Sequence, residues 1–151
     1  IEESELPEYT FYDQIDGFYL QFQPVADVTS YDLQSVENTL NNIVANFQRS
    51  SNDKQFFAGL NAPALSADDF TCPSADCLIS PRASAYATYP VDLAAQLDFY
   101  RTYLSALSQR SWVQGISSRG FFPVVKLHDF SSSIYGKPAM QLLMNSTTDA
   151  E

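Results

Sequence analysis

Three apolar segments with little charge alternate along the chain with segments of helical periodicity. The apolar segments cover residues 15–22, 55–60 and 112–117. They are short and rich in aromatic and branched side chains, a pattern typical of mostly buried strands. We therefore predict three strands at these positions.

Apolar residues three and four positions apart predict two amphipathic helices, at residues 32–49 and 91–109. Thr29 with Asp32 resembles a capping box before the first helix, and Pro90 is placed to open the second. A short final helix is predicted from Lys137-Pro138 onwards. The stripe of the first helix contains Leu33, Val36, Leu40, Ile43, Val44 and Phe47. The stripe of the second contains Leu93, Leu97, Tyr100, Leu104 and Leu107.

The order strand, helix, strand, helix, strand, helix predicts an α/β fold of parallel strands joined by crossovers. Three parallel strands leave both edges of a sheet open, so we expect three βα units of a larger assembly. The predicted organisation is an acidic lead-in or linker at 1–14, the βα units at 15–144 and a tail at 145–151. A long irregular stretch from 62 to 89 is typical of a functional loop.

The charge balance excludes several classes of function. The 151 residues carry 18 acidic and 8 basic side chains, a net charge of −10, and such a chain repels nucleic acid and anionic lipid. A single His and two Cys cannot supply four zinc ligands, so we expect neither a metal site nor another cofactor. No apolar run approaches the roughly 20 residues of a membrane span.

Weak signals favour a secreted or extracellular protein. The chain begins with Ile1 rather than Met, and we expect a processed product or a piece of a longer protein. Cys72 and Cys77 are placed to close a small loop as a disulfide, with two free buried thiols as the alternative. Asn145 begins an Asn-Ser-Thr glycosylation triplet.

The third predicted βα unit contains the most specific sequence motifs. The segment from Trp112 reads WVQGISSRGFFP, and the segment from Asp129 reads DFSSSIYGKPA. Gly136 permits a left-handed turn there, and Pro138 presets the first helical φ. This ending resembles that of TIM-barrel glycoside hydrolases, particularly endo-mannanase-like barrels. The upstream segments YDQIDGFY and FFAGLNAPALSAD resemble two earlier strands of the same barrels.

The resemblance implies that the chain is the C-terminal portion of a TIM barrel, its last three βα units. It implies hydrolysis of glycosidic bonds in an oligo- or polysaccharide, with site residues at the carboxyl ends of the strands. The barrel would be completed by upstream residues or by other copies of the chain.

One departure from the family pattern bears on catalysis. Aligned on Ser66, the chain has Asn61 where these enzymes carry the glutamate nucleophile, and an amide cannot form the glycosyl ester. No Glu lies between Glu37 and Glu151, so a small shift does not restore it. The alternative is therefore a non-catalytic carbohydrate-binding or structural subunit derived from a glycosidase barrel.

Two groups of candidate residues follow. Asp68 and Asp69 form the paired carboxylates beyond the second strand, and they act either as acid and base or as a solvated loop pair. Five residues are candidates for substrate binding. They are Asp16, Tyr19, Asn61, Trp112 and Arg119.

Each substrate-binding candidate has a structural alternative. Asp16 can cap the start of a strand, and Asn61 can be a turn residue. Tyr19 and Trp112 suit stacking on a pyranose face, but most of the 21 aromatic residues must be core. Arg119 can hold a sugar hydroxyl, or it can pair with Asp129.

Overall fold

The structure is a computed structural model that describes residues 16–24, 32–48, 54–66, 78–123 and 128–148. The predicted lead-in at 1–14 lies outside these residues. So do the candidate carboxylates Asp68 and Asp69 and the cysteine pair Cys72 and Cys77.

The three predicted strands form one parallel sheet in the order β1-β2-β3. Strand β1 is Gly17–Phe22, β2 is Gln55–Leu60 and β3 is Val113–Ser118. The helices are α1 (Leu33–Gln48), α2 (Leu93–Ser108) and α3 (Pro138–Thr148), and a 3₁₀ turn, η4, covers Ser84–Tyr86. The predicted α/β class and element order are confirmed.

The ends of two helices differ from the prediction. Asp92 rather than Pro90 starts α2, because its carboxylate accepts a hydrogen bond of 2.9 Å from the backbone N–H of Ala95. Asp32 does the same for α1 through Ser35, whereas Thr29 lies outside the described residues. Helix α3 continues past the predicted start of the tail at residue 145.

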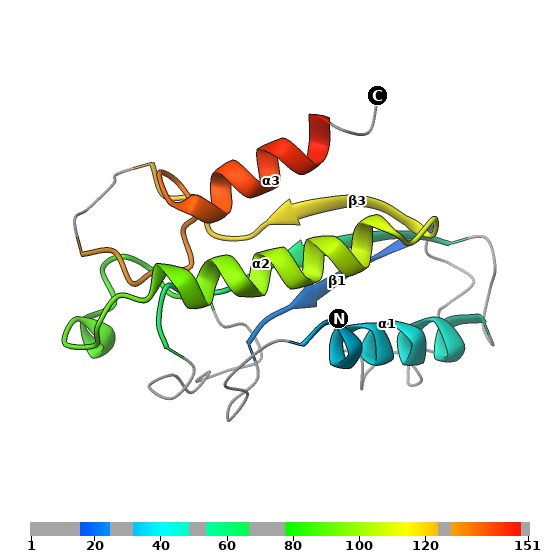
Figure 1. Ribbon diagram of the computed structural model, residues 1–151, viewed down its shortest axis with the longest axis horizontal. Coiled ribbons are helices and arrows are strands. Elements are labelled where there is room, and N and C mark those ends of the chain that lie inside the picture. Colours follow the sequence, from blue (N-terminus) through cyan, green and yellow to red (C-terminus); the bar gives the residue numbers. More distant parts are fainter. Residues whose placement is uncertain (1–15, 25–31, 49–53, 67–77, 124–127, 149–151) are drawn as a thin grey trace.

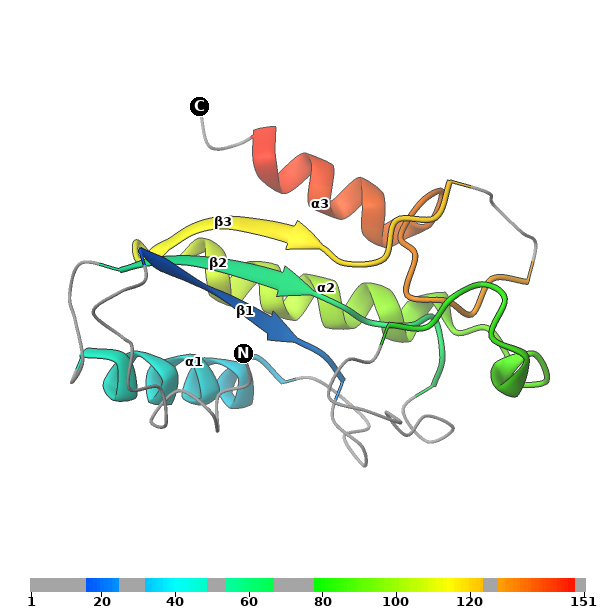
Figure 2. The ribbon, with the colours of Figure 1, turned by 180° about the vertical axis from the view of Figure 1, so that it is seen from behind.

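One face of the sheet is covered by α1 and α2 (Figure 1). Alternate residues of β1 and β2 point into this core. The predicted stripes contribute Val36, Leu40 and Ile43 of α1 and Tyr100, Leu104 and Leu107 of α2, whereas Leu33 and Leu93 are exposed. No described helix lies over the opposite face, which is turned toward the viewer in Figure 2. We call that second face the inner face, because in a closed barrel the face opposite the helices points inward. The core residues on the strands are Phe18, Leu20, Phe22, Phe56, Ala58 and Leu60.

We expect residues 1–151 alone to be unstable as a monomer. Within the described residues, β1 and β3 each have a partner on one side only, and Tyr19 and Phe57 of the inner face are 42% and 43% exposed. Open edges and exposed rings favour association. Sedimentation velocity over a range of concentrations, combined with urea unfolding, tests this. A monomer that unfolds cooperatively in dilute solution would contradict it.

Candidate functional site

Because the strands are parallel, their carboxyl ends meet at one edge of the sheet. The strand ladder continues one residue beyond β2 and β3. The N–H of Asn61 donates to the carbonyl of Phe22 at 3.0 Å, and the N–H of Arg119 donates to the carbonyl of Leu60 at 2.8 Å. Asn61 and Arg119 therefore lie beside each other at the carboxyl edge, as predicted, where TIM barrels carry their active sites.

The ring of Tyr19 crosses β2 on the inner face. Its hydroxyl lies 3.0 Å from Oγ of Ser117 on β3. The ring can lie there because Gly59, in the central strand β2, has no side chain. A Cβ on Gly59 would be 2.0 Å from the Tyr19 hydroxyl oxygen. Gly115 accommodates the ring of Phe57 in a similar way. The glycines thus let aromatic rings lie across the sheet.

The guanidinium of Arg119 donates a hydrogen bond to the side-chain oxygen of Gln21, the inner-face residue of β1 nearest the carboxyl edge. Asp129, the alternative partner expected for Arg119, forms an ion pair with Lys137 at 3.5 Å. Arg119, Gln21 and the Tyr19 hydroxyl therefore place planar hydrogen-bonding groups beside exposed aromatic surface. This combination suits a polar ligand with apolar faces.

Asn61 occupies the centre of this edge, but its side chain is not open to solvent. The residue is 0% exposed, and neither Oδ1 nor Nδ2 has a hydrogen-bond partner among the described residues. Burial of an unpaired polar group costs about 1–3 kcal/mol, so such a group needs an explanation. The Asn61 side chain is therefore not part of the exposed surface of the inner face.

Two candidates lie at the wrong end of the sheet. Asp16 precedes β1 and Trp112 precedes β3, so both are at the amino ends of the strands. The Trp112 ring packs edge-on against Phe56 at 5.1 Å, on the helix-covered side. The expectation that Asp16 lies at the carboxyl edge is wrong, and the structure separates both residues from Asn61 and Arg119.

Helix α2 holds the chain as it leaves β2. Three alternate backbone carbonyls, at residues 60, 62 and 64, accept hydrogen bonds from three α2 residues spaced four apart. The Tyr100 hydroxyl donates to Leu60 at 3.0 Å. The Gln96 amide donates to Ala62 at 2.8 Å, and the N–H of Asp92 donates to Ala64 at 2.8 Å. We call these three bonds the α2 clamp.

The loop before α3 folds over the same region through a buried polar cluster. The Lys137 ammonium donates to the carbonyl of Ser131 at 2.8 Å and pairs with Asp129, whose carboxylate accepts from the N–H of Ser131 at 2.9 Å. Gln96 also donates to the carbonyl of Ser133 at 3.3 Å. The serine run also bonds within itself, since Oγ of Ser131 accepts from the N–H of Ser133 at 3.2 Å.

Sequence reasoning missed Gln96, Tyr100 and Lys137 as parts of this region. The apolar spacing places Tyr100 on a hydrophobic stripe, and Lys137 is predicted only as the start of the final helix. The available signal was one of spacing: Asp92, Gln96 and Tyr100 put polar atoms on one face of a helix otherwise apolar there.

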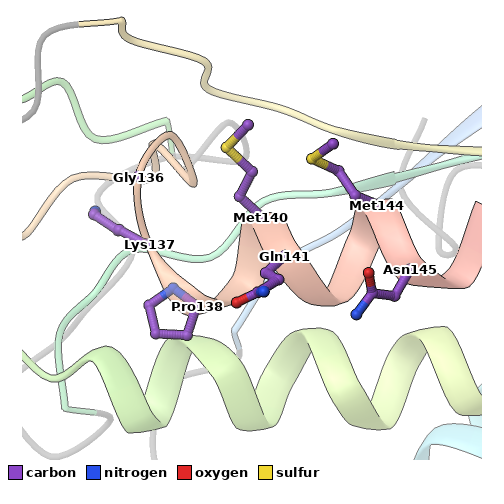
Figure 3. Close-up of a pocket in the computed structure, with 7 residues that line it drawn as sticks. All are labelled: Gly136, Lys137, Pro138, Met140, Gln141, Met144 and Asn145. Atoms are coloured by element: carbon purple, nitrogen blue, oxygen red, sulfur yellow. The ribbon is translucent and has the colours of Figure 1, made fainter.

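A groove of about 610 Å³ runs along α3 (Figure 3). Met140 and Met144 project from the side of the helix that faces away from α2. The groove is lined by Gly136, Lys137, Pro138, Met140, Gln141, Met144 and Asn145. The Lys137 ammonium is engaged with Ser131 and Asp129, so the groove is mainly apolar.

The described residues contain neither a membrane-spanning helix nor a cluster of metal ligands. No described helix is both long and apolar enough to cross a bilayer. Nowhere among the same residues do three or more His, Cys, Asp or Glu side chains come together as metal ligands.

Comparison with solved structures shows what the fold is similar to. The chain superposes on GH113 β-1,4-mannanase with a TM-score of 0.64 at 18% identity, over 97% of this chain and 43% of the mannanase. The GH113 β-mannanase AaManA of Alicyclobacillus acidocaldarius gives a TM-score of 0.65 at 17% identity, over 98% of this chain and 43% of the mannanase. The β-glucuronidase of Ruminococcus gnavus gives 0.61 at 12%, over 96% and 25%. No family model and no curated protein sequence matches.

These matches confirm that the fold is similar to part of a TIM-barrel glycoside hydrolase. The chain spans less than half the length of the mannanases. At such identities the similarity concerns the fold, and the chemistry must be argued from this chain's own residues.

We predict that Gly59→Ala destabilises the protein by about 1–2 kcal/mol, because the new methyl group displaces the Tyr19 ring and breaks its bond to Ser117. Elsewhere Gly→Ala in a strand is neutral or stabilising, so the sign is diagnostic. Urea unfolding measures the change. Tyr19→Phe is the matched control, which removes only the hydroxyl and should cost less. Unchanged stability of Gly59→Ala would show that the ring is not held there.

We also predict a pH dependence from Lys137. Burial lowers the pKa of its ammonium from 10.5 to about 8, although Asp129 opposes the shift. Above about pH 8 the unfolded chain therefore binds more protons, and the free energy of unfolding rises with pH. The rise should be about 1–2 kcal/mol between about pH 7.5 and 9.5. Above about pH 10 it is opposed by Tyr100, whose pKa is raised by burial.

Lys137→Arg is the control for this pH dependence, because a guanidinium stays charged throughout the range. Chemical unfolding of both proteins at several pH values gives the comparison. Equal slopes for the two proteins would mean that Lys137 titrates normally.

Proposed function

We propose that this chain forms the carbohydrate-binding part of a glycoside-hydrolase-like barrel. A sugar would lie over the inner face at the carboxyl edge, against the Tyr19 ring, with hydroxyl groups bonded by Arg119 and Gln21. Pyranose rings present apolar C–H faces and a rim of hydroxyls, which such a surface complements.

The observation that carries the proposal is the exposed, hydrogen-bonded arrangement of Tyr19 and Arg119 on three strands that match a mannanase barrel. The Tyr19 ring starts in the middle of β1 and reaches over Gly59 to Ser117, near the carboxyl end of β3, and Arg119 directly follows β3. Their geometry is preorganised by Ser117 and Gln21, so little side-chain entropy remains to be lost on binding.

Charge favours a neutral sugar over a uronic acid. The chain has a net charge of −10, which disfavours an anionic glucuronide. A β-1,4-linked manno-oligosaccharide is therefore the first probe, and a glucuronide is the second.

Hydrolysis is the second candidate function, and the fold similarity favours it. Retaining glycosidases need two carboxyl groups about 5–5.5 Å apart. Asn61, at the end of β2, cannot be one of them. Asp68 and Asp69 are the candidates on this chain, and the remaining carboxylate would come from upstream residues or another copy of the chain. Asp68→Asn and Asp69→Asn test this assignment by their hydrolysis rates.

We further propose that the protein is extracellular, with Cys72 and Cys77 joined and Asn145 glycosylated. Asn145 is exposed on α3, as an acceptor must be. Mass spectrometry of the native protein, with and without reduction and deglycosylation, tests all three features.

The main test uses the full-length protein with calorimetry for binding and product analysis for hydrolysis. We expect Tyr19→Ser and Arg119→Ala each to weaken manno-oligosaccharide binding about 10-fold or more, because each removes a direct contact. Arg101→Ala is the matched control, since Arg101 is exposed on α2 and pairs only loosely with Asp98 at 4.0 Å.

Binding without turnover would support a non-catalytic carbohydrate-binding protein. Turnover that Asp68→Asn or Asp69→Asn abolishes would support the enzyme. If Tyr19→Ser and Arg119→Ala bind as tightly as the wild type, the inner face is not the sugar site.

A further inference from the structure

Two buried amides at the end of β2 have polar atoms that no described residue satisfies. They are Oδ1 and Nδ2 of Asn61 and Oε1 of Gln96. The residues are 0% and 1% exposed. The Gln96 amide is bonded to the carbonyl of Ala62, the residue after Asn61. These three unsatisfied atoms therefore lie along one short stretch of chain, where α2 meets the carboxyl edge of the sheet.

The chemistry of these atoms limits what can occupy the position. Two are acceptors and one is a donor, and all three belong to neutral groups. A cation would be repelled by the Nδ2 donor of Asn61, and the nearby Asp129 is already paired with Lys137 and the N–H of Ser131. An anion would meet the two unpaired acceptors. A neutral O–H group both donates and accepts, and it suits the set.

We propose that Asn61 and Gln96 form a buried binding site for a hydroxyl group, supplied either by an ordered water molecule or by a bound sugar. Its O–H donates to Oδ1 of Asn61 or Oε1 of Gln96, and its oxygen accepts from an amide. The sugar alternative rests on the proposed function, whereas the water alternative does not.

Occupation of this site would give Asn61 a positioning role. The bound group would tie the end of β2 to the α2 clamp and hold the Asn61 side chain away from the inner face. Asn61 would then act on ligand binding through the shape of the carboxyl edge.

The first test is a substitution whose sign is informative. Asn61→Leu replaces the amide with an apolar side chain of similar size. If a hydroxyl group is bound to the amide, the substitution leaves that hydroxyl without its hydrogen-bond partner. The urea midpoint of the full-length protein then falls by about 0.5 M or more. If the amide is unsatisfied, the same change removes buried polar atoms and raises the midpoint, which would overturn the proposal.

Asn42→Leu is the matched control, because it makes the same change at an exposed position on α1. We expect its urea midpoint to stay close to that of the wild type.

The second test uses the unaltered full-length protein, so it does not depend on whether a variant folds. In ¹⁵N-labelled protein, the Nδ2 protons of Asn61 should show cross-peaks to long-lived water in rotating-frame NMR spectra. A β-1,4-linked manno-oligosaccharide is then added. Persistence of the water signal identifies water as the ligand, and its replacement by contacts to sugar protons identifies a sugar hydroxyl. Absence of both contacts would overturn the proposal.

A sugar that binds elsewhere while the water signal persists would leave the hydroxyl site supported and the proposed function unaffected. Failure of the protein to bind any sugar would sink only the proposed function.

Discussion

The course of the chain at the carboxyl edge depends on a match between two repeats. Four residues of α-helix advance about 6.0 Å, and two residues of extended chain advance about 6.6 Å. Residues four apart on α2 can therefore reach alternate carbonyls of residues 60, 62 and 64, as the α2 clamp does. The Leu60 carbonyl also accepts from the N–H of Arg119, whereas the carbonyls of Ala62 and Ala64 depend on α2 for these hydrogen bonds. The clamp fixes where β2 ends, and so where Asn61 and the loop before α3 lie.

The polar contact between α2 and the sheet joins the ends of two strands, which hydrophobic packing alone would not do. The Tyr100 hydroxyl also lies 2.7 Å from Oγ of Ser118, so one side chain of α2 joins the ends of β2 and β3. Burial raises the pKa of this phenol and keeps it protonated, which preserves the bond to the Leu60 carbonyl at ordinary pH. The helix thus sets the spacing of two strand ends at the edge that would bind a ligand.

The architecture was predictable from the sequence because each element carries a periodic signal. The strand at 55–60 was predicted with its observed bounds, the third strand lies one residue later than the predicted 112–117, and α1 and α2 follow from apolar spacing. Side-chain direction was not predictable in the same way. Trp112 and Asp16 lie within one residue of a strand start, at the end of the sheet opposite to Asn61 and Arg119. Gln96 gave no strong signal, because a buried amide in a helix is recognisable only once its carbonyl partners are known.

The arrangement also separates binding from catalysis within this chain. The Tyr19 and Arg119 contacts are made on the inner face through Ser117 and Gln21, and none of these bonds involves Asn61. Loss of a carboxylate at the end of β2 would therefore leave the stacking ring and the guanidinium in place. Catalytic rate depends on groups that stabilise charge in the transition state, whereas sugar affinity depends on contacts already made in the ground state. A barrel with this arrangement can lose catalysis and retain sugar binding, because the two sets of side chains are held by different bonds.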